Sequence, residues 1–192
     1  MEPLDQLFQK LWDDYKTLNN QADGIHRLLV ERGEKIINDH IAFRTINIPD
    51  LGVDALAQIF VKNGYVSNGE YQFPEKKLFA RHYEHPNPDY PKIFISELKL
   101  QETSHALRNF IHKLVIQIPF DAIKKWDWCV AGPLWKPSPW DVYQKMKEES
   151  EYAAWLTVFG FRANHFTVSF NSYWFTSTIA INPPFPTRNS RR

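Results

Sequence analysis

The sequence predicts an α+β fold within one domain, and three observations predict it. Apolar residues recur at helical spacing near the start of the chain, over 3–18. Between residues 39 and 100 the pattern reads strand, helix, strand, strand, strand. A mostly helical segment over 104–158 then leads to a last strand with clean alternation, 161–170. Strands and helices that are segregated along the chain are typical of α+β architecture.

Composition narrows the class of protein. Of the 192 residues, 43% are hydrophobic and 23% are charged, as in ordinary globular proteins. The formal net charge of +1 gives no reason to expect binding to nucleic acid or to a membrane surface. The single cysteine, Cys129, excludes an intramolecular disulfide. No apolar run approaches the roughly 18 residues of a membrane helix, and no secretory signal opens the sequence, so we expect a cytoplasmic protein.

Residues 1–35 are expected to form a helical cap. Pro3 suits the first turn of a helix, and the apolar stripe that follows extends to Leu18. A second, shorter helix is expected at 25–32, because Gly33 is a typical residue just past a helix C-terminus.

Residues 36–100 are expected to form a unit of one strand, one helix and three strands. Turn residues separate the elements, with Pro49 after the first strand and Gly64 after the helix. The expected elements are a strand at 39–47, a helix at 51–63, and strands at 65–73, 77–84 and 92–100.

The second half of the chain is expected to be a helical insertion over 101–160, with an irregular Trp- and Pro-rich segment between Trp126 and Trp140. One strand follows over 161–171. The tail, 172–192, is rich in proline and ends in arginines, so we expect it to be irregular.

The first strand carries the residues of greatest chemical interest. Side chains on a strand alternate between faces, so His40 and Arg44 share one side with Ala42. On the last strand, His165 lies among small residues in the same way. We interpret His40 and His165 as metal ligands and Arg44 as the group that binds an anionic substrate. The alternatives are ordinary buried histidines and a structural ion pair.

A carboxylate completes the candidate set. Glu97 shares a strand face with two isoleucines, where an ionised group is costly unless it is paired or bound to a metal. Two histidines and one carboxylate are the ligands of non-haem Fe(II) oxygenases, and they would also suit Zn²⁺ or Mn²⁺. A salt bridge between Glu97 and Arg44, or another basic residue, is the alternative.

Three segments carry a resemblance to a known family: Asn38 to Thr45, Ile95 to Leu98, and Asn164 to Ser169. They resemble the short members of the 2-oxoadipate dioxygenase/decarboxylase (2-hydroxyglutarate synthase) family, which is related to the vicinal oxygen chelate superfamily. The resemblance covers about residues 1–171. It implies paired βαβββ modules, the first of them at 36–100.

The resemblance also implies an activity. An Fe(II) enzyme of this family converts 2-oxoadipate and O₂ to 2-hydroxyglutarate and CO₂, in lysine degradation. By resemblance, His40 and His165 match the metal histidines, and Arg44 matches the arginine that binds the substrate carboxylate. The family's third ligand is a late glutamate in the second module, so Glu97 is only a tentative substitute.

The sequence leaves the family pattern just after Phe170. We therefore expect an incomplete second module, as a premature end or a frameshift would produce. The strand at 161–171 would then have an open edge, which favours self-association. Three alternative functions remain: a glyoxalase-like metal isomerase or lyase on the same fold, with Glu97 as a ligand; a truncated, non-catalytic remnant; and, from the aromatic content alone, a small-ligand binding module without a metal.

Overall fold

The structure is a computed structural model that describes residues 3–33, 36–172 and 175–181. Single-turn 3₁₀ helices lie at Pro74–Lys76, Leu100–Glu102 and Trp128–Val130. The helices are α1 (Pro3–Leu18), α2 (Asn20–Glu31), α3 (Val53–Val61), α4 (His105–Val115), α5 (Phe120–Ile123), α6 (Trp140–Glu149) and α7 (Glu151–Phe159), and the strands are β1 (Ile36–Ile46), β2 (Val66–Phe73), β3 (Leu78–Glu84), β4 (Lys92–Leu98), β5 (Ala163–Ser172) and β6 (Phe175–Ile181).

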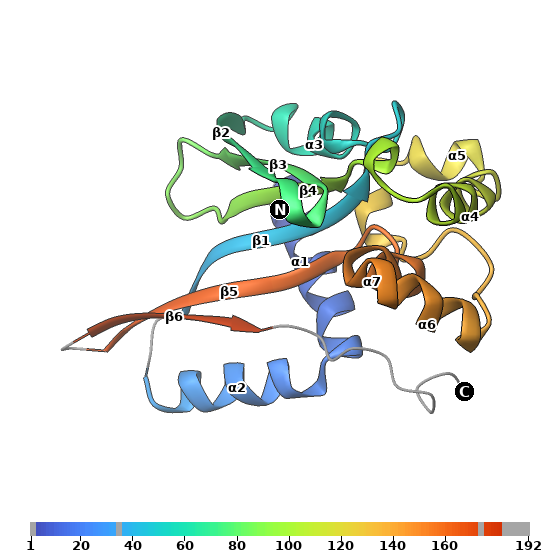
Figure 1. Cartoon of the computed structure of the whole chain (residues 1–192). Coiled ribbons are helices and arrows are strands. Elements are labelled where there is room, and N and C mark those ends of the chain that lie inside the picture. The colour runs from blue at the N-terminus through green and yellow to red at the C-terminus, as the bar shows by residue number, and fades with distance from the viewer. Residues whose placement is uncertain (1–2, 34–35, 173–174, 182–192) are drawn as a thin grey trace.

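The described strands form one mixed sheet in the order β2-β3-β4-β1-β5-β6 (Figure 1). Neighbouring strands run antiparallel except β1 and β4, which are parallel. The expected order of strand, helix and three strands is confirmed over β1, α3, β2, β3 and β4. The α+β class and the N-terminal helices are likewise confirmed.

Of the two N-terminal helices, only the second differs from expectation. The first spans Pro3–Leu18 as predicted, but the second begins at Asn20 and continues through Gly24. Glycine within a helix costs about 1 kcal/mol relative to alanine. Ala22, in the same turn, is completely buried. None of the described helices is long and apolar enough to span a bilayer.

One face of the sheet is covered by α1 and α3 and holds much of the core. Phe43 of β1 packs on Phe60 of α3, with ring centroids 5.6 Å apart. Phe166 of β5 packs on Tyr15 of α1 at 4.8 Å. In Figure 1, α1 passes behind the sheet. The alternate residues of β1, beginning with His40, therefore face the other side.

The helical insertion contains α4 to α7. Ser138 and Pro139 suit the start of a helix, and the sequence predicts one helix from there to about residue 156. The structure breaks it at Ser150, which has extended φ and ψ angles of −152° and 105°. Its hydroxyl accepts a hydrogen bond from the backbone N–H of Ala153 and caps α7. Most of the first turns of α7 are buried, including Tyr152 and Trp155. This break turns α7 onto the end of the sheet, beside β1.

The expectation of an irregular tail from residue 172 is wrong for part of that segment. Residues Phe175–Ile181 form β6, which pairs antiparallel with β5 (Figure 1). The β-branched residues of this stretch favour a strand. The average composition of 172–192 does not show this, because prolines are concentrated in the residues that follow. Residues 182–192 lie outside the described part of the chain. The predicted open edge at 161–171 is corrected by the same observation, because β6 covers it.

Candidate active site

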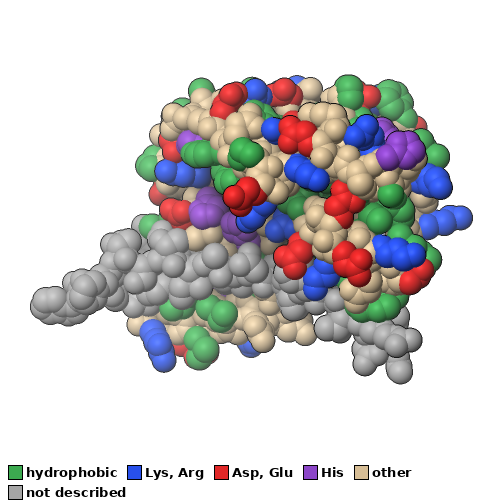
Figure 2. Space-filling model, viewed as in Figure 1, with side chains coloured by type: hydrophobic (Ala, Val, Ile, Leu, Met, Phe, Trp, Pro, Cys, Tyr) green, Lys and Arg blue, Asp and Glu red, His purple; other side chains and the backbone are tan. Residues whose placement is uncertain are grey.

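Two histidines from distant segments meet on the open face of the sheet. In the antiparallel pairing of β1 with β5, His40 lies opposite Thr167 and Ala42 lies opposite His165. Their Nε2 atoms lie 3.2 Å apart, and the rings meet edge to face with centroids 5.3 Å apart. Figure 2 shows histidine side chains, in purple, gathered on this face beside acidic and basic groups.

The other ring nitrogen of each histidine has a partner of its own. Nδ1 of His40 lies 2.7 Å from Oδ2 of Asp39, to which it donates. This contact leaves the lone pair of His40 on Nε2, where the Thr167 hydroxyl lies 2.9 Å away. Nδ1 of His165 lies 3.0 Å from the side-chain nitrogen of Asn164. A carboxylate on the far nitrogen of a histidine is a common way to orient a metal ligand.

Burial shapes the charge of the pair. Burial, together with the neighbouring charges of His40 and Arg44, lowers the pKa of His165 to about 4. His165 is therefore a neutral imidazole at neutral pH. A histidine must be neutral to donate a lone pair to a metal.

The geometry of the pair fits a shared metal ion. Two nitrogens, each about 2.0–2.1 Å from one ion at roughly 90–110°, would be about 2.9–3.4 Å apart. The observed separation of 3.2 Å falls in that range. Ligation through both Nε2 atoms would require the hydrogen of His165 to be on Nδ1, where the carbonyl oxygen of a turned Asn164 amide could accept it.

The tentative third ligand, Glu97, must be corrected. In the parallel pairing of β1 with β4, Glu97 lies opposite Thr45, which faces away from His40 and Arg44. Its Oε2 accepts a hydrogen bond of 2.8 Å from the backbone N–H of Val53, at the start of α3. The carboxylate therefore caps a helix on the opposite face of the sheet. The alternative interpretation, a salt bridge between Glu97 and Arg44, is absent among the described residues for the same reason.

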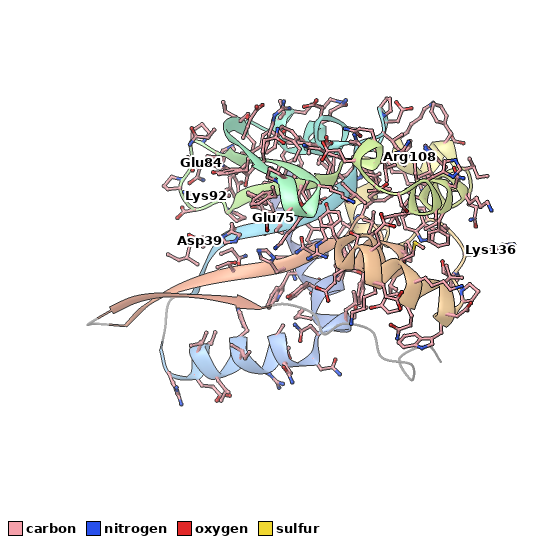
Figure 3. All side chains as sticks on the ribbon, viewed as in Figure 1. Asp39, Glu75, Glu84, Lys92, Arg108 and Lys136 are labelled. Carbon is pink, nitrogen blue, oxygen red and sulfur yellow. The ribbon has the colours of Figure 1, made fainter. Side chains whose placement is uncertain are left out.

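Within the described residues, no group of three or more His, Cys, Asp or Glu side chains could hold a metal ion. The structure thus brings together two of the three proposed ligands. The nearest acidic side chain by sequence, Asp39, is engaged with Nδ1 of His40. Figure 3 shows Asp39 beside β1, below Lys92 and Glu84, which form an ion pair of 2.9 Å.

Arg44 lies on the same face as His40, two positions beyond Ala42, and its guanidinium packs against two aromatic rings. Its guanidinium carbon is 4.9 Å from the ring centroids of both Tyr152 and Trp155 in α7. Among the described residues it makes no ion pair and no hydrogen bond, so its donors remain available. Burial lowers the pKa of Arg44, while Tyr152 and Glu151 oppose the shift, and an arginine remains charged in this setting.

Tyr152 fixes α7 against the sheet. Its hydroxyl accepts a hydrogen bond from the backbone N–H of Thr45 at 3.0 Å and donates to the carbonyl of Ser96 at 2.6 Å. The Ser96 hydroxyl lies 3.0 Å away as well. Tyr152 and Trp155 were missed by sequence reasoning, because nothing local in the helical insertion links them to Arg44. The high aromatic content was the only signal.

Cavities open at several places on the described part of the chain. One of about 370 Å³ is lined by Arg44, Tyr152 and residues of the turn between β2 and β3. A larger one, of about 580 Å³, lies between α3 and α5 and contains none of the predicted site residues. The smaller cavity is the one that connects with the proposed substrate-binding group.

Comparison with known proteins begins with a family model. Residues 4–119 match the model described as 2-oxoadipate dioxygenase/decarboxylase. A curated rice (Oryza sativa subsp. japonica) protein named 2-oxoadipate dioxygenase/decarboxylase, chloroplastic/amyloplastic, is 35% identical over 148 residues, which is 71% of this chain. The chain spans only about two fifths of that relative (41%). The compartment of this chain and its pathway remain predictions.

Several solved structures are similar to this chain in fold. A protein from Shewanella frigidimarina, provisionally described as a hydrolase, is 43% identical to this chain, and the two structures superpose with a TM-score of 0.81. The superposition covers 86% of this chain and 65% of the Shewanella protein. Rice hydroxyglutarate synthase, in complex with 2-oxoadipate, is 31% identical to this chain with a TM-score of 0.78. That superposition covers 87% of this chain and 58% of the rice protein. A Ralstonia eutropha protein provisionally placed in the glyoxalase superfamily superposes with a TM-score of 0.71 over 92% of this chain and 79% of its own length. At 15% identity it shows a similarity of fold alone.

Proposed function

Because this chain belongs to the 2-oxoadipate dioxygenase/decarboxylase family, we propose that it binds Fe(II) and a 2-oxo acid on the open face of its sheet. The proposed reaction converts 2-oxoadipate and O₂ to 2-hydroxyglutarate and CO₂. The observation that carries the proposal is the convergence of His40 and His165 on the same face as the unpaired guanidinium of Arg44.

His40 and His165 would hold the iron through their Nε2 atoms. The metal would supply a redox centre for O₂ and a Lewis acid for the 2-oxo group. Asp39 keeps the hydrogen of His40 on Nδ1, so the lone pair of Nε2 faces the site. A further ligand has to come from the substrate, from water, or from residues outside the described set.

Arg44 would bind a substrate carboxylate. A guanidinium presents paired donors to a carboxylate, and these bonds strengthen when water is excluded. The rings of Tyr152 and Trp155 hold the guanidinium in place. The substrate is therefore positioned by a cation that is already oriented and partly desolvated.

The test is an anaerobic Fe(II) titration with and without 2-oxoadipate, read by the visible absorption band of an Fe(II)–2-oxo acid chelate. We expect a band only with both components, and its loss in His165→Ala. O₂ uptake matched to CO₂ release should accompany turnover. Absence of the band, with no metal retained, would contradict the proposal and favour a non-catalytic remnant.

The glyoxalase-like alternative rests on the fold likeness to the Ralstonia protein. It predicts activity with Zn²⁺ or Ni²⁺ and no consumption of O₂. Repeating the assay with these ions in an oxygen electrode separates the two functions.

A further inference from the structure

The cavity beside Arg44 is lined by a second cationic side chain, that of Lys77. Its volume of about 370 Å³ falls within the roughly 300–1,000 Å³ of small-molecule sites. Arg44 lies on β1, and Lys77 lies on the turn that joins β2 to β3. Apolar groups line the same space: Leu78, Leu98 and the ring of Tyr152.

Lys77 is held in an unusual backbone conformation. With φ at +57°, it is the only non-glycine residue with positive φ in the described part of the chain. Its backbone N–H donates to the carbonyl of Pro74, and its carbonyl accepts from the N–H of Lys99 at 2.9 Å. The turn is thereby tied to the end of β4. Left-handed backbone at a non-glycine residue is costly, and such residues are enriched at functional sites.

The ammonium of Lys77 is only loosely engaged. Its Nζ lies 4.0 Å from Oε1 of Glu149. That carboxylate is already bound by Ser104, whose backbone N–H donates to Oε1 at 2.8 Å and whose hydroxyl donates to Oε2 at 2.6 Å. Lys77 therefore has donors available for a second anion.

The remaining charged groups of the wall do not cancel these two cations. The other charged groups of the wall, Glu75, Glu149, Glu151 and Lys76, are exposed, so water and salt screen their charges. Figure 3 shows Glu75 near the middle of the viewed face. Arg44, in contrast, packs against the rings of Tyr152 and Trp155 in α7.

We propose that this cavity binds an α,ω-dicarboxylate, with Arg44 on one carboxylate and Lys77 on the other. Leu78 and Leu98 would contact the methylene chain between them. Lys77 is then the residue that selects a dicarboxylic over a monocarboxylic 2-oxo acid. This inference rests on the proposed function, because it assigns Arg44 to the substrate.

The experiment uses ligands without a 2-oxo group, so that iron plays no part. Calorimetric titration of the metal-free chain compares adipate with hexanoate, which has the same chain length and one carboxylate. We expect adipate to bind about tenfold tighter, as one added charge-assisted contact of about 1.4 kcal/mol implies. Lys77→Met should remove that ratio without changing hexanoate binding, and Lys77→Arg should keep most of it.

Lys113→Met is the matched control, because Lys113 is an exposed lysine of α4 outside the cavity. It should retain the full ratio, and thermal unfolding should show each variant folded. Equal binding of adipate and hexanoate by the wild type, or an unchanged ratio in Lys77→Met, overturns the inference. If the absorption band of iron with 2-oxoadipate is intact but adipate binds no tighter than hexanoate, the role of Lys77 is refuted and the proposed reaction is not. If adipate binds tighter than hexanoate but the chain binds no iron, the proposed reaction is refuted and the role of Lys77 is not.

Discussion

The Nε2 atoms of His40 and His165 lie 3.2 Å apart, although 125 positions separate the two residues in the sequence. The antiparallel pairing of β1 with β5 produces this contact, with bulges on either side of the histidines. Bulges re-aim side chains and are frequent beside active sites. The sheet thus brings two imidazoles to the separation that one metal ion requires.

Removing either histidine should abolish tight metal binding. We expect His40→Ala and His165→Ala each to weaken Fe(II) affinity by at least about 100-fold, because loss of a direct ligand exceeds the 10–100-fold effect of an outer partner. Anaerobic titration with a competing chelator measures the affinity. His105→Ala, at an exposed position of α4, is the control and should bind as the wild type does. Retained affinity in either active-site variant would refute the assignment.

Asp39→Asn should weaken metal binding by about tenfold without unfolding the protein. The substitution keeps an oxygen that can accept from Nδ1 of His40 but removes the charge that makes the imidazole a better ligand. The same chelator competition measures it, with far-UV circular dichroism as the check on folding. A variant as tight as the wild type would show that the Asp39 contact is only structural.

Arg44→Lys should lower affinity for 2-oxoadipate by about tenfold or more, although the positive charge is retained. An ammonium cannot present paired donors to a carboxylate, and it packs less well than a planar guanidinium against the rings of Tyr152 and Trp155. Calorimetry on the Fe(II)-loaded chain gives the dissociation constant. Metal affinity without substrate should be unchanged, and a parallel loss of metal would instead indicate a disturbed site.

Alternation along single strands was enough to predict which residues of β1 share a face. It placed His40 with Arg44, and it predicted that Glu97 shares a face with Ile93 and Ile95. What the sequence lacked was the register between strands. No short turn links β1 to β4, so nothing local indicated that Glu97 pairs with Thr45 and faces away from the histidines.

Long-range packing accounts for the other differences. Tyr152 and Trp155 reach Arg44 only because α6 and α7 separate at Ser150, a break that one backbone residue determines. Strand β6 was missed because composition was averaged over a tail whose first part, Phe175–Ile181, has strand residues of its own. Both features depend on contacts that periodicity within a segment does not contain.

Tyr152→Phe should lower the free energy of unfolding by about 1–3 kcal/mol. The buried hydroxyl serves the N–H of Thr45 and both oxygens of Ser96, and its loss leaves buried polar groups without a partner. Urea denaturation followed by fluorescence measures the change. The ring that faces Arg44 remains, so substrate affinity should fall much less than in Arg44→Lys. A stability equal to that of the wild type would mean that water replaces the hydroxyl.

Glu97→Gln should stabilise the protein more at pH 7 than at pH 4 and leave metal affinity unchanged. Burial raises the pKa of Glu97, and the hydrogen bond from Val53 only partly opposes that shift. A raised pKa in the folded state means that the neutral form is favoured there, so the wild type loses stability as the pH rises through that value. Glutamine can still accept from the N–H of Val53 and carries no charge at either pH. Urea denaturation at both pH values, together with an Fe(II) titration, tests both statements. A loss of metal binding would return Glu97 to the ligand set, and equal effects at the two pH values would show that the carboxylate is not strained by burial.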